Sequence, residues 1–159
     1  MICSTYADLF ALHTASLRFF TVYGPRQRPE MAIHKFAKLI EEGRPVPFFG
    51  DGTSARDYTF IDDILKGILR AVDRVGQLPE PFRIYNLGGS RTTSLAHLVK
   101  LLEQALGKRS ILDRQPDQPG DVPLTFADVT RAGAELGYGP KVPIEEGVRR
   151  FVDWFRAAR

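Results

Sequence analysis

The sequence contains little cysteine, little histidine and no long apolar run. Cys3 is the only cysteine among 159 residues, so no internal disulfide can form, and we expect a reducing, cytoplasmic location. Three histidines and one cysteine give no cluster with metal-ligand spacing, so we expect no metal site. No apolar run reaches the roughly 18–20 residues that a membrane-spanning helix needs, so we expect no membrane partner.

The excess of positive over negative charge is also small. The 22 Lys and Arg residues exceed the 19 Asp and Glu residues by only three, and the basic residues are scattered along the chain. A weak, dispersed positive charge does not indicate a nucleic-acid partner. With 43% hydrophobic and 26% charged residues, the composition is that of an ordinary globular protein with a real core.

Helical and strand patterns alternate along the chain. Apolar residues at helical spacing predict helices over residues 2–13, 31–43, 61–75, 95–107, 130–136 and 144–158. Runs of β-branched and aromatic residues predict strands over residues 14–23, 82–89 and 110–115, with two short strands around a Gly-Asp-Gly turn inside residues 44–61. No repeat or linker divides the chain, so we expect residues 1–159 to form a single α/β unit.

Several helix ends carry capping signals. Ser94 is predicted to cap the helix over residues 95–107, and Gly107 is predicted to end it. Asp62 or Asp63 is predicted to cap the helix over residues 61–75. The apolar stripe of that last helix is expected to consist of Ile64, Leu65, Ile68, Leu69 and Val72.

Three arginines follow or interrupt apolar strands. Arg26 and Arg28 come after a Tyr-Gly-Pro turn, and Arg56 stands in "SARDYTF" between two apolar stretches. The planar guanidinium suits phosphate and carboxylate oxygens. A solvated surface arginine is the ordinary alternative, because most arginines are exposed. Arg56 departs from that alternative, because an Asp and two aromatic residues follow it closely.

Two further stretches give weaker signals. In "NLGGSRTTS", residues 86–94, a strand runs into a glycine pair and a capped helix, which can hold an anion or can simply be a tight turn. The stretch lacks the G-x-G-x-x-G spacing of a dinucleotide site. In "QPGDVPLTFAD", Asp121 can accept hydrogen bonds from sugar hydroxyls or can be an ordinary turn residue. Without a complete catalytic set, residue patterns alone indicate an α/β domain with a possible anion site.

Four motifs in order carry a specific resemblance: "LRFFTVYGPRQRPEM", "GDGTSARDYTFIDDI", "YNLGG" and "QPGDVPLTFAD". Together they resemble the C-terminal half of the NAD-dependent sugar-nucleotide epimerases and dehydratases, the extended short-chain dehydrogenases. The stretch "TVYGPRQRPEMA" is most similar to UDP-glucuronate 4-epimerases, with UDP-glucose 4-epimerases as the near alternative. The resemblance implies the C-terminal portion of a Rossmann-type fold with its small substrate-binding domain.

The resemblance also implies that the NAD-binding and catalytic parts lie outside this sequence. The glycine-rich fingerprint is missing, and no tyrosine is followed four residues later by lysine. The chain is therefore expected to be a fragment with no catalytic residues of its own, inactive alone, whose longer parent binds NAD. The alternatives are a related dehydratase, a stand-alone nucleotide-binding module, and an interaction fragment that self-associates through exposed sheet edges.

The resemblance implies a nucleotide site built from four residues. Arg56 would hold the diphosphate, and Asp121 would meet the ribose hydroxyls. Pro47 and Phe49 would flank the uracil. Gln118 stands where some UDP-glucose epimerases carry a second phosphate-binding arginine, which weakens an assignment to UDP-glucose.

Other residues are implied to contact the sugar and the cofactor. Thr21 would reach the sugar or the diphosphate, and Arg28 would lie near the C6 carboxylate of a glucuronate. Glu30 and Met31 would lie alongside the substrate. Three residues would approach the nicotinamide of NAD, mainly through the backbone: Val22, Tyr23 and Pro25.

Overall fold

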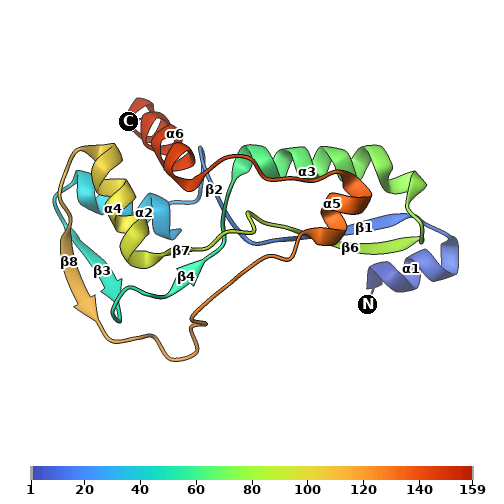
Figure 1. Ribbon diagram of the computed structural model, residues 1–159, viewed down its shortest axis with the longest axis horizontal. Coiled ribbons are helices and arrows are strands. Elements are labelled where there is room, and N and C mark those ends of the chain that lie inside the picture. Colours follow the sequence, from blue (N-terminus) through green and yellow to red (C-terminus); the bar gives the residue numbers. More distant parts are fainter. Residues whose placement is uncertain (1, 159) are drawn as a thin grey trace.

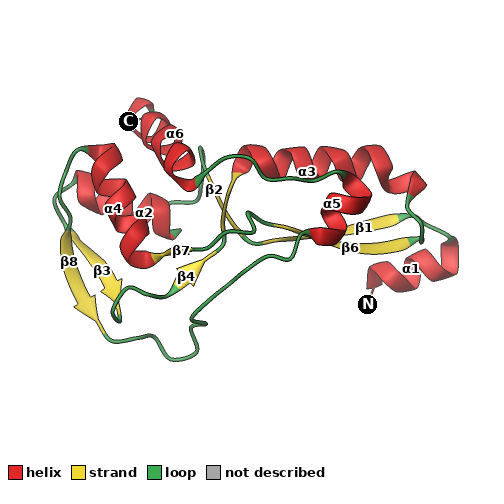
Figure 2. Ribbon diagram, viewed as in Figure 1, coloured by secondary structure: helices red, strands yellow, loops and turns green. Residues whose placement is uncertain are grey.

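Two hydrophobic cores organise the chain in this computed structural model, which describes residues 2–158. The helices are α1 (Ile2–Phe10), α2 (Ala32–Glu41), α3 (Ile61–Arg74), α4 (Leu95–Leu106), α5 (Thr130–Leu136) and α6 (Ile144–Ala157). The strands are β1 (Thr14–Phe19), β2 (Thr21–Tyr23), β3 (Pro45–Phe49), β4 (Ala55–Arg56), β5 (Tyr58–Phe60), β6 (Phe82–Leu87), β7 (Thr93–Ser94) and β8 (Ile111–Gln115). The mixture confirms the α/β class (Figure 2).

The molecule is elongated, with a different set of elements at each end (Figure 1). At one end, α3 and α5 accompany β1 and β6, and α1 lies beside the same strands. At the other end, α2, α4 and α6 accompany β3 and β8. The short strands β2, β4, β5 and β7 lie between the two ends, so residues at the junction are held by both.

The strands form four separate pairs. β1 pairs with β6, β2 with β5 and β3 with β8, all parallel, whereas β4 and β7 are antiparallel. Parallel partners need long crossover connections, which is why strands far apart in sequence meet here. The β3–β8 pair confirms the strand predicted over residues 110–115.

The first core joins three helices to β3. It buries the apolar stripes of α2, α4 and α6 against each other, including Ile33, Phe36, Leu98, Leu102, Val148 and Phe151. The second, smaller core packs α3 and α5 on β6, including Ile64, Tyr85, Leu87, Ala132 and Leu136. The helices predicted for these segments are confirmed, with ends that differ by at most two residues.

The predicted ends of α4 are confirmed in detail. The Ser94 hydroxyl accepts a hydrogen bond from the His97 amide at 3.2 Å, as an N-cap residue does. Gly107 has the left-handed conformation, with φ of 65°, that ends many helices.

The predictions for α3 are partly wrong. The cap position is Phe60 rather than Asp62 or Asp63, and no side chain caps the helix. Leu65, Leu69 and Val72 are exposed, and the buried face carries Asp63, Ile64, Gly67 and Ala71 instead. Contact distance explains the small residues, since a Cβ added at Gly67 would lie 2.7 Å from Leu87 Cδ1.

The prediction of a single buried strand over residues 14–23 is also wrong. It divides into β1 and β2 at Phe20, and the two pieces pair with different partners. Phe19 at the end of β1 is 50% exposed. The segment 44–61 likewise forms three short strands, β3, β4 and β5, rather than two.

Large apolar side chains are exposed around β1 and β6. Both strands have only one hydrogen-bonded neighbour, and the exposed set in this part of the chain is Ile2, Tyr6, Leu9, Phe10, Leu12, Phe19 and Ile84. Parallel sheets are normally covered on both faces. Across residues 2–158, no helix combines the length and apolar character that crossing a membrane requires.

Candidate functional site

Arg56 and Asp121 meet at the junction between the two ends of the molecule. The Arg56 Nη2 atom lies 2.5 Å from Asp121 Oδ1, although the residues are 65 positions apart. The backbone brings them together, because the Ala55 amide donates to Pro123 O and the Thr125 amide donates to Ala55 O. The Arg56 side chain is 20% exposed, and its acidic partner within residues 2–158 is Asp121, whose side chain is 51% exposed.

A hollow of about 530 Å³ lies beside this pair. Its lining includes Phe49 from β3, Asp51 and Thr53 from the Gly-Asp-Gly turn, and Gln118 and Asp121 from the following loop. Aromatic, hydroxyl and carboxylate groups therefore face one concave space next to a guanidinium. Such a lining can stack a planar ring while hydrogen-bonding a polar ligand.

Asp57, directly after Arg56, fixes the backbone of the site. Its buried carboxylate accepts hydrogen bonds from the amides of Gly89, Ser90 and Ala127 at 2.6, 3.0 and 2.9 Å. The Thr59 hydroxyl donates to the same carboxylate at 3.2 Å. One side chain thus ties the turn after β6 to the segment that follows Asp121.

Thr21 lies on the other side of the same strand segment. Its amide donates to Asp57 O at 3.1 Å, and it lines a separate hollow with Arg18, Phe20 and Thr125. The Thr125 hydroxyl in turn accepts from the Asp57 amide at 3.0 Å. Thr21 is therefore joined to the Arg56 segment through backbone contacts, but it does not line the hollow of Asp121.

Tyr58 adds a neutral phenol near the pair. The pKa of Tyr58 is raised to about 12, chiefly by burial; the Arg56 charge opposes this rise and the Asp121 charge adds to it. The phenol therefore stays protonated at neutral pH and can donate a hydrogen bond.

The Tyr-Gly-Pro turn ends β2 beside α3. Gly24 has φ of 144°, and a Cβ there would lie 2.6 Å from Ile61 Cγ2, so only glycine fits. The Tyr23 side chain points into the first core and its hydroxyl lies 3.5 Å from Ile144 O. Val22 and Pro25 are half-buried. The roles proposed for these residues toward NAD stay predictions.

Arg28, Glu30 and Met31 form a separate exposed group before α2. Arg28 Nε lies 3.6 Å from Glu30 Oε1, and its Nη2 lies 3.9 Å from the Met31 sulfur. None of the three lines the hollow beside Asp121. The structure thus brings Phe49, Arg56 and Asp121 together, with Pro47 on the same strand, and leaves the Arg28 group apart.

Sequence reasoning missed the two buried carboxylates. Asp57 was assigned no role of its own, and Asp63 was predicted only as a helix cap. The local sequence gives little signal for either, because Asp57 follows Arg56 and Asp63 follows Asp62.

Comparison with known proteins matches residues 1–88 to the NAD dependent epimerase/dehydratase family. This chain belongs to that family. Among curated relatives, a probable UDP-glucuronate 4-epimerase from Rhizobium meliloti is 40% identical over 171 residues, covering 98% of this chain and 50% of the relative. A UDP-glucuronate 4-epimerase from Thermodesulfobacterium geofontis is 39% identical over 155 residues, covering 97% of this chain and 46% of the relative.

Solved structures of family members share the fold. A Bacillus cereus UDP-glucuronic acid 4-epimerase in complex with UDP-glucuronic acid and NAD superposes with a TM-score of 0.88 at 34% identity, covering 99% of this chain and 50% of that one. A Thermotoga maritima UDP-glucose 4-epimerase with UDP-glucose superposes with a TM-score of 0.90 at 33% identity, covering 99% of this chain and 50% of that one. The chain therefore spans about half the length of the family members that it matches.

Proposed function

We propose that this chain is the UDP-sugar-binding, C-terminal portion of an NAD-dependent nucleotide-sugar 4-epimerase that acts on UDP-glucuronate. The observation that carries the proposal is the Arg56 side chain, 20% exposed and held against Asp121, which lines a hollow of about 530 Å³. A diphosphate needs such a cation, and the hollow offers an aromatic ring and polar groups for a nucleoside. UDP-sugar complexes of family members support the same ligand class.

In this proposal each part of the nucleotide has a partner. Arg56 binds the diphosphate, Asp121 accepts from the ribose hydroxyls, and Phe49 with Pro47 flanks the uracil. The Arg56–Asp121 contact keeps the guanidinium in place before the ligand arrives. Preorganisation of this kind lowers the entropy cost of binding.

The sugar end is assigned to the loop before α2 and to Thr21. Arg28 binds the C6 carboxylate of glucuronate, with Glu30 and Met31 beside the sugar. Gln118 lines the hollow next to Asp121. A neutral amide at that position leaves Arg56 as the main diphosphate cation, which favours UDP-glucuronate over UDP-glucose as the substrate of the parent.

The residues of this chain fit one end of NAD only. The parallel strands β2 and β5 end together at Tyr23 and Phe60, and ligands of α/β proteins bind at this edge. Val22, Tyr23 and Pro25 would form a wall for the nicotinamide there. The sequence has no glycine-rich turn for the NAD diphosphate, so we assign that part to the rest of the parent. When bound, NAD supplies a reversible hydride acceptor.

The exposed apolar side chains around β1 and β6 are assigned to the same missing part. Family members are about twice as long as this chain, and an isolated parallel pair of strands is an unstable arrangement. The occupant proposed for this face is the remaining, NAD-binding portion of the parent.

The proposal is tested with the isolated chain, UDP-glucuronate and NAD. We expect saturable binding of UDP-glucuronate by calorimetry and no C4 epimer by chromatography, because no acid/base pair or tightly held hydride carrier is present. An absence of UDP-glucuronate binding would contradict the site. Measurable epimer formation would contradict the assignment of catalysis to the rest of the parent.

A further inference from the structure

A second, smaller hollow of about 210 Å³ lies between α3 and the loop after α5. It is lined by Lys66, Arg70, Gly137, Tyr138, Gly139 and Lys141. Three of these residues are cationic and none is acidic. The hollow shares no lining residue with the one beside Asp121, so it is a distinct place on the molecule.

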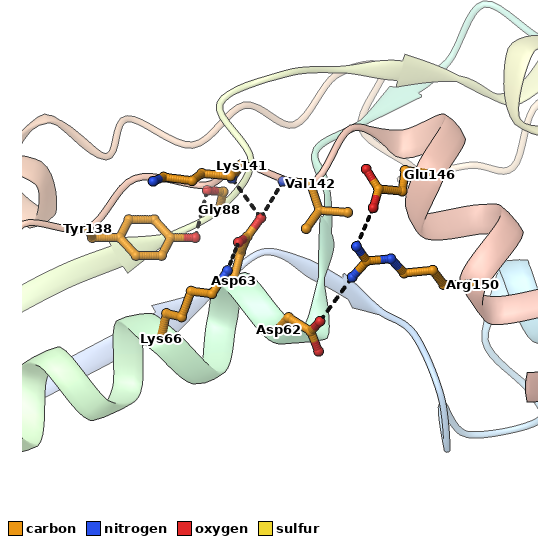
Figure 3. Close-up of polar contacts among 9 residues, drawn as sticks. All are labelled: Asp62, Asp63, Lys66, Gly88, Tyr138, Lys141, Val142, Glu146 and Arg150. Atoms are coloured by element: carbon orange, nitrogen blue, oxygen red, sulfur yellow. Dashed lines mark hydrogen bonds and ion pairs between the residues drawn. The ribbon is translucent and has the colours of Figure 1, made fainter.

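A buried carboxylate, Asp63, holds the Lys66 ammonium and the backbone of Lys141. Asp63 Oδ2 accepts hydrogen bonds from the amides of Lys141 and Val142, both at 2.8 Å, and Asp63 Oδ1 lies 3.2 Å from Lys66 Nζ. Figure 3 shows the Lys66 and Lys141 side chains on opposite sides of the Tyr138 ring, with Asp63 between their backbones. The loop is therefore clamped to the first turn of α3.

A second contact holds the floor of the hollow. The buried Tyr138 hydroxyl donates to Gly88 O at 3.0 Å, which anchors the Gly137–Gly139 stretch to the turn after β6 (Figure 3). Lys66 and Arg70 are four residues apart on α3 and so lie on one face of the helix. The hollow is thus built from a rigid helix and a loop pinned at two points.

Two of the three cations lack an acidic partner. Within residues 2–158, neither the Arg70 guanidinium nor the Lys141 ammonium makes an ion pair, whereas Lys66 shares Asp63 with two amides. Asp62 contacts Arg150 and Glu135 accepts from Tyr85, while the exposed Asp73, three residues after Arg70 on α3, makes no ion pair with it within residues 2–158. An uncompensated positive charge therefore faces a concave space with room for several water molecules.

We infer that this hollow binds a phosphate dianion, either free or as the terminal group of a small phosphomonoester. A planar guanidinium and two ammonium groups around one cavity match a compact group with several acceptor oxygens. The dianion would compete with Asp63 for the Lys66 ammonium. Asp63 would still accept hydrogen bonds from the amides of Lys141 and Val142. The inference does not depend on the UDP-sugar site.

The test uses the chain with Arg56→Ala, which removes the proposed diphosphate cation, labelled with ¹⁵N. Inorganic phosphate is titrated at constant ionic strength while amide shifts are followed. We expect saturable shifts at Gly137, Gly139 and Lys141. Glycerol phosphate is titrated in parallel, and tighter binding of the ester identifies a phosphomonoester as ligand, whereas equal binding identifies the dianion itself.

Matched variants decide whether the shifts report a site. Arg70→Gln and Lys141→Ala, which retains the amide bonded to Asp63, should each weaken phosphate binding at least fivefold. Lys35→Ala, on the exposed face of α2, should leave it unchanged. Two results would overturn the inference. One is amide shifts that do not saturate in the Arg56→Ala chain; the other is a loss of phosphate affinity in Lys35→Ala as large as in Arg70→Gln and Lys141→Ala. The amide spectrum itself shows whether each variant is folded.

Discussion

The Arg56 guanidinium lies 2.5 Å from the Asp121 carboxylate across 65 residues of sequence. The pair joins the short strand β4 to the proline-rich loop that follows β8, and it stands beside the hollow assigned to the nucleotide. In the proposed account the cation serves the diphosphate and the carboxylate serves the ribose. Each residue therefore has two partners, one within the protein and one on the ligand.

Asp121→Asn is expected to weaken UDP binding less than a change at Arg56. The amide keeps one acceptor for a ribose hydroxyl but loses the charge that orients Arg56. We expect a three- to tenfold loss, or about 0.7–1.4 kcal/mol. Calorimetric titration of UDP measures it, with Asp51→Asn, which lines the same hollow, as the comparison. A greater loss for Asp51→Asn would place the ribose elsewhere.

Arg28→Ala should distinguish the two candidate sugars. An arginine–carboxylate contact contributes about 1.5–3 kcal/mol when the acceptor is charged. In the full-length parent, the substitution should therefore weaken UDP-glucuronate binding at least tenfold more than UDP-glucose binding. Equal losses for both sugars would remove Arg28 from the sugar site and with it the preference for glucuronate.

Asp57→Asn should destabilise the fold without touching a ligand. The carboxylate accepts three backbone amides in a fully buried position, and an amide side chain would present a donor to one of them. We expect the free energy of unfolding to fall by about 2–4 kcal/mol. Urea denaturation measures it, with Asp73→Asn on the exposed face of α3 as the control. A loss no larger than that of the control would show that Asp57 is not a structural centre.

Glu103 should contribute stability that depends on pH. The amide and hydroxyl of Ser110 both donate to Glu103 Oε1 at 2.8 Å and hold the pKa of this carboxyl below its ordinary value. Because the folded pKa is depressed, the contribution is complete above the unfolded pKa of 4.5 and is lost as the pH falls through the folded value. Glu103→Gln should cost roughly 1 kcal/mol at pH 7 and progressively less toward pH 3.

Denaturation of Glu103→Gln and wild type across this pH range makes the comparison. Asp153→Asn, an exposed change on α6, serves as the control and should show no such convergence. A difference between Glu103→Gln and wild type that stays constant from pH 7 to pH 3 would contradict the assigned cause.

The isolated chain should self-associate through the exposed apolar side chains around β1. The Phe19 side chain, at the end of β1, is 50% exposed. One edge of β1 is open, because its sheet contains β1 and β6 alone within residues 2–158, and open edges can pair with another chain. Sedimentation velocity should show mass increasing with concentration, and Phe19→Lys should reduce it. Ile111→Lys, on the distant strand β8, should not. If Ile111→Lys alone disperses the chain, the β3–β8 edge is the associating surface.

The sequence predicted some elements far better than others. The stripes of α2, α4 and α6 repeat at helical spacing and pack in one core, so periodicity alone located them. The apolar stripe predicted for α3 was partly wrong, because the close approach of this helix to Leu87 and Tyr138 requires a glycine, Gly67, on the buried face. Local pattern cannot show which neighbour a helix will meet.

The candidate site, like the helices, was only partly predictable from the sequence. The family resemblance placed Arg56 and Asp121 in one nucleotide site, but no residue pattern predicted their direct contact. Their contact depends on the loop around Pro123 and Thr125 pairing with Ala55, which is set by tertiary structure. The amide acceptors Asp57 and Asp63 went unrecognised for that reason, since their partners lie 32 or more residues away.

The central claim is that Arg56 binds the diphosphate, and Arg56→Ala tests it most directly. UDP and uridine are each titrated by calorimetry into the wild-type chain and into the variant. The account predicts that the variant loses at least tenfold in UDP affinity, or 1.4 kcal/mol, and much less for uridine, which has no phosphate. An exposed ion pair with no ligand role would contribute only about 0–1 kcal/mol to stability and nothing to binding. Unchanged UDP affinity in the variant would contradict the account.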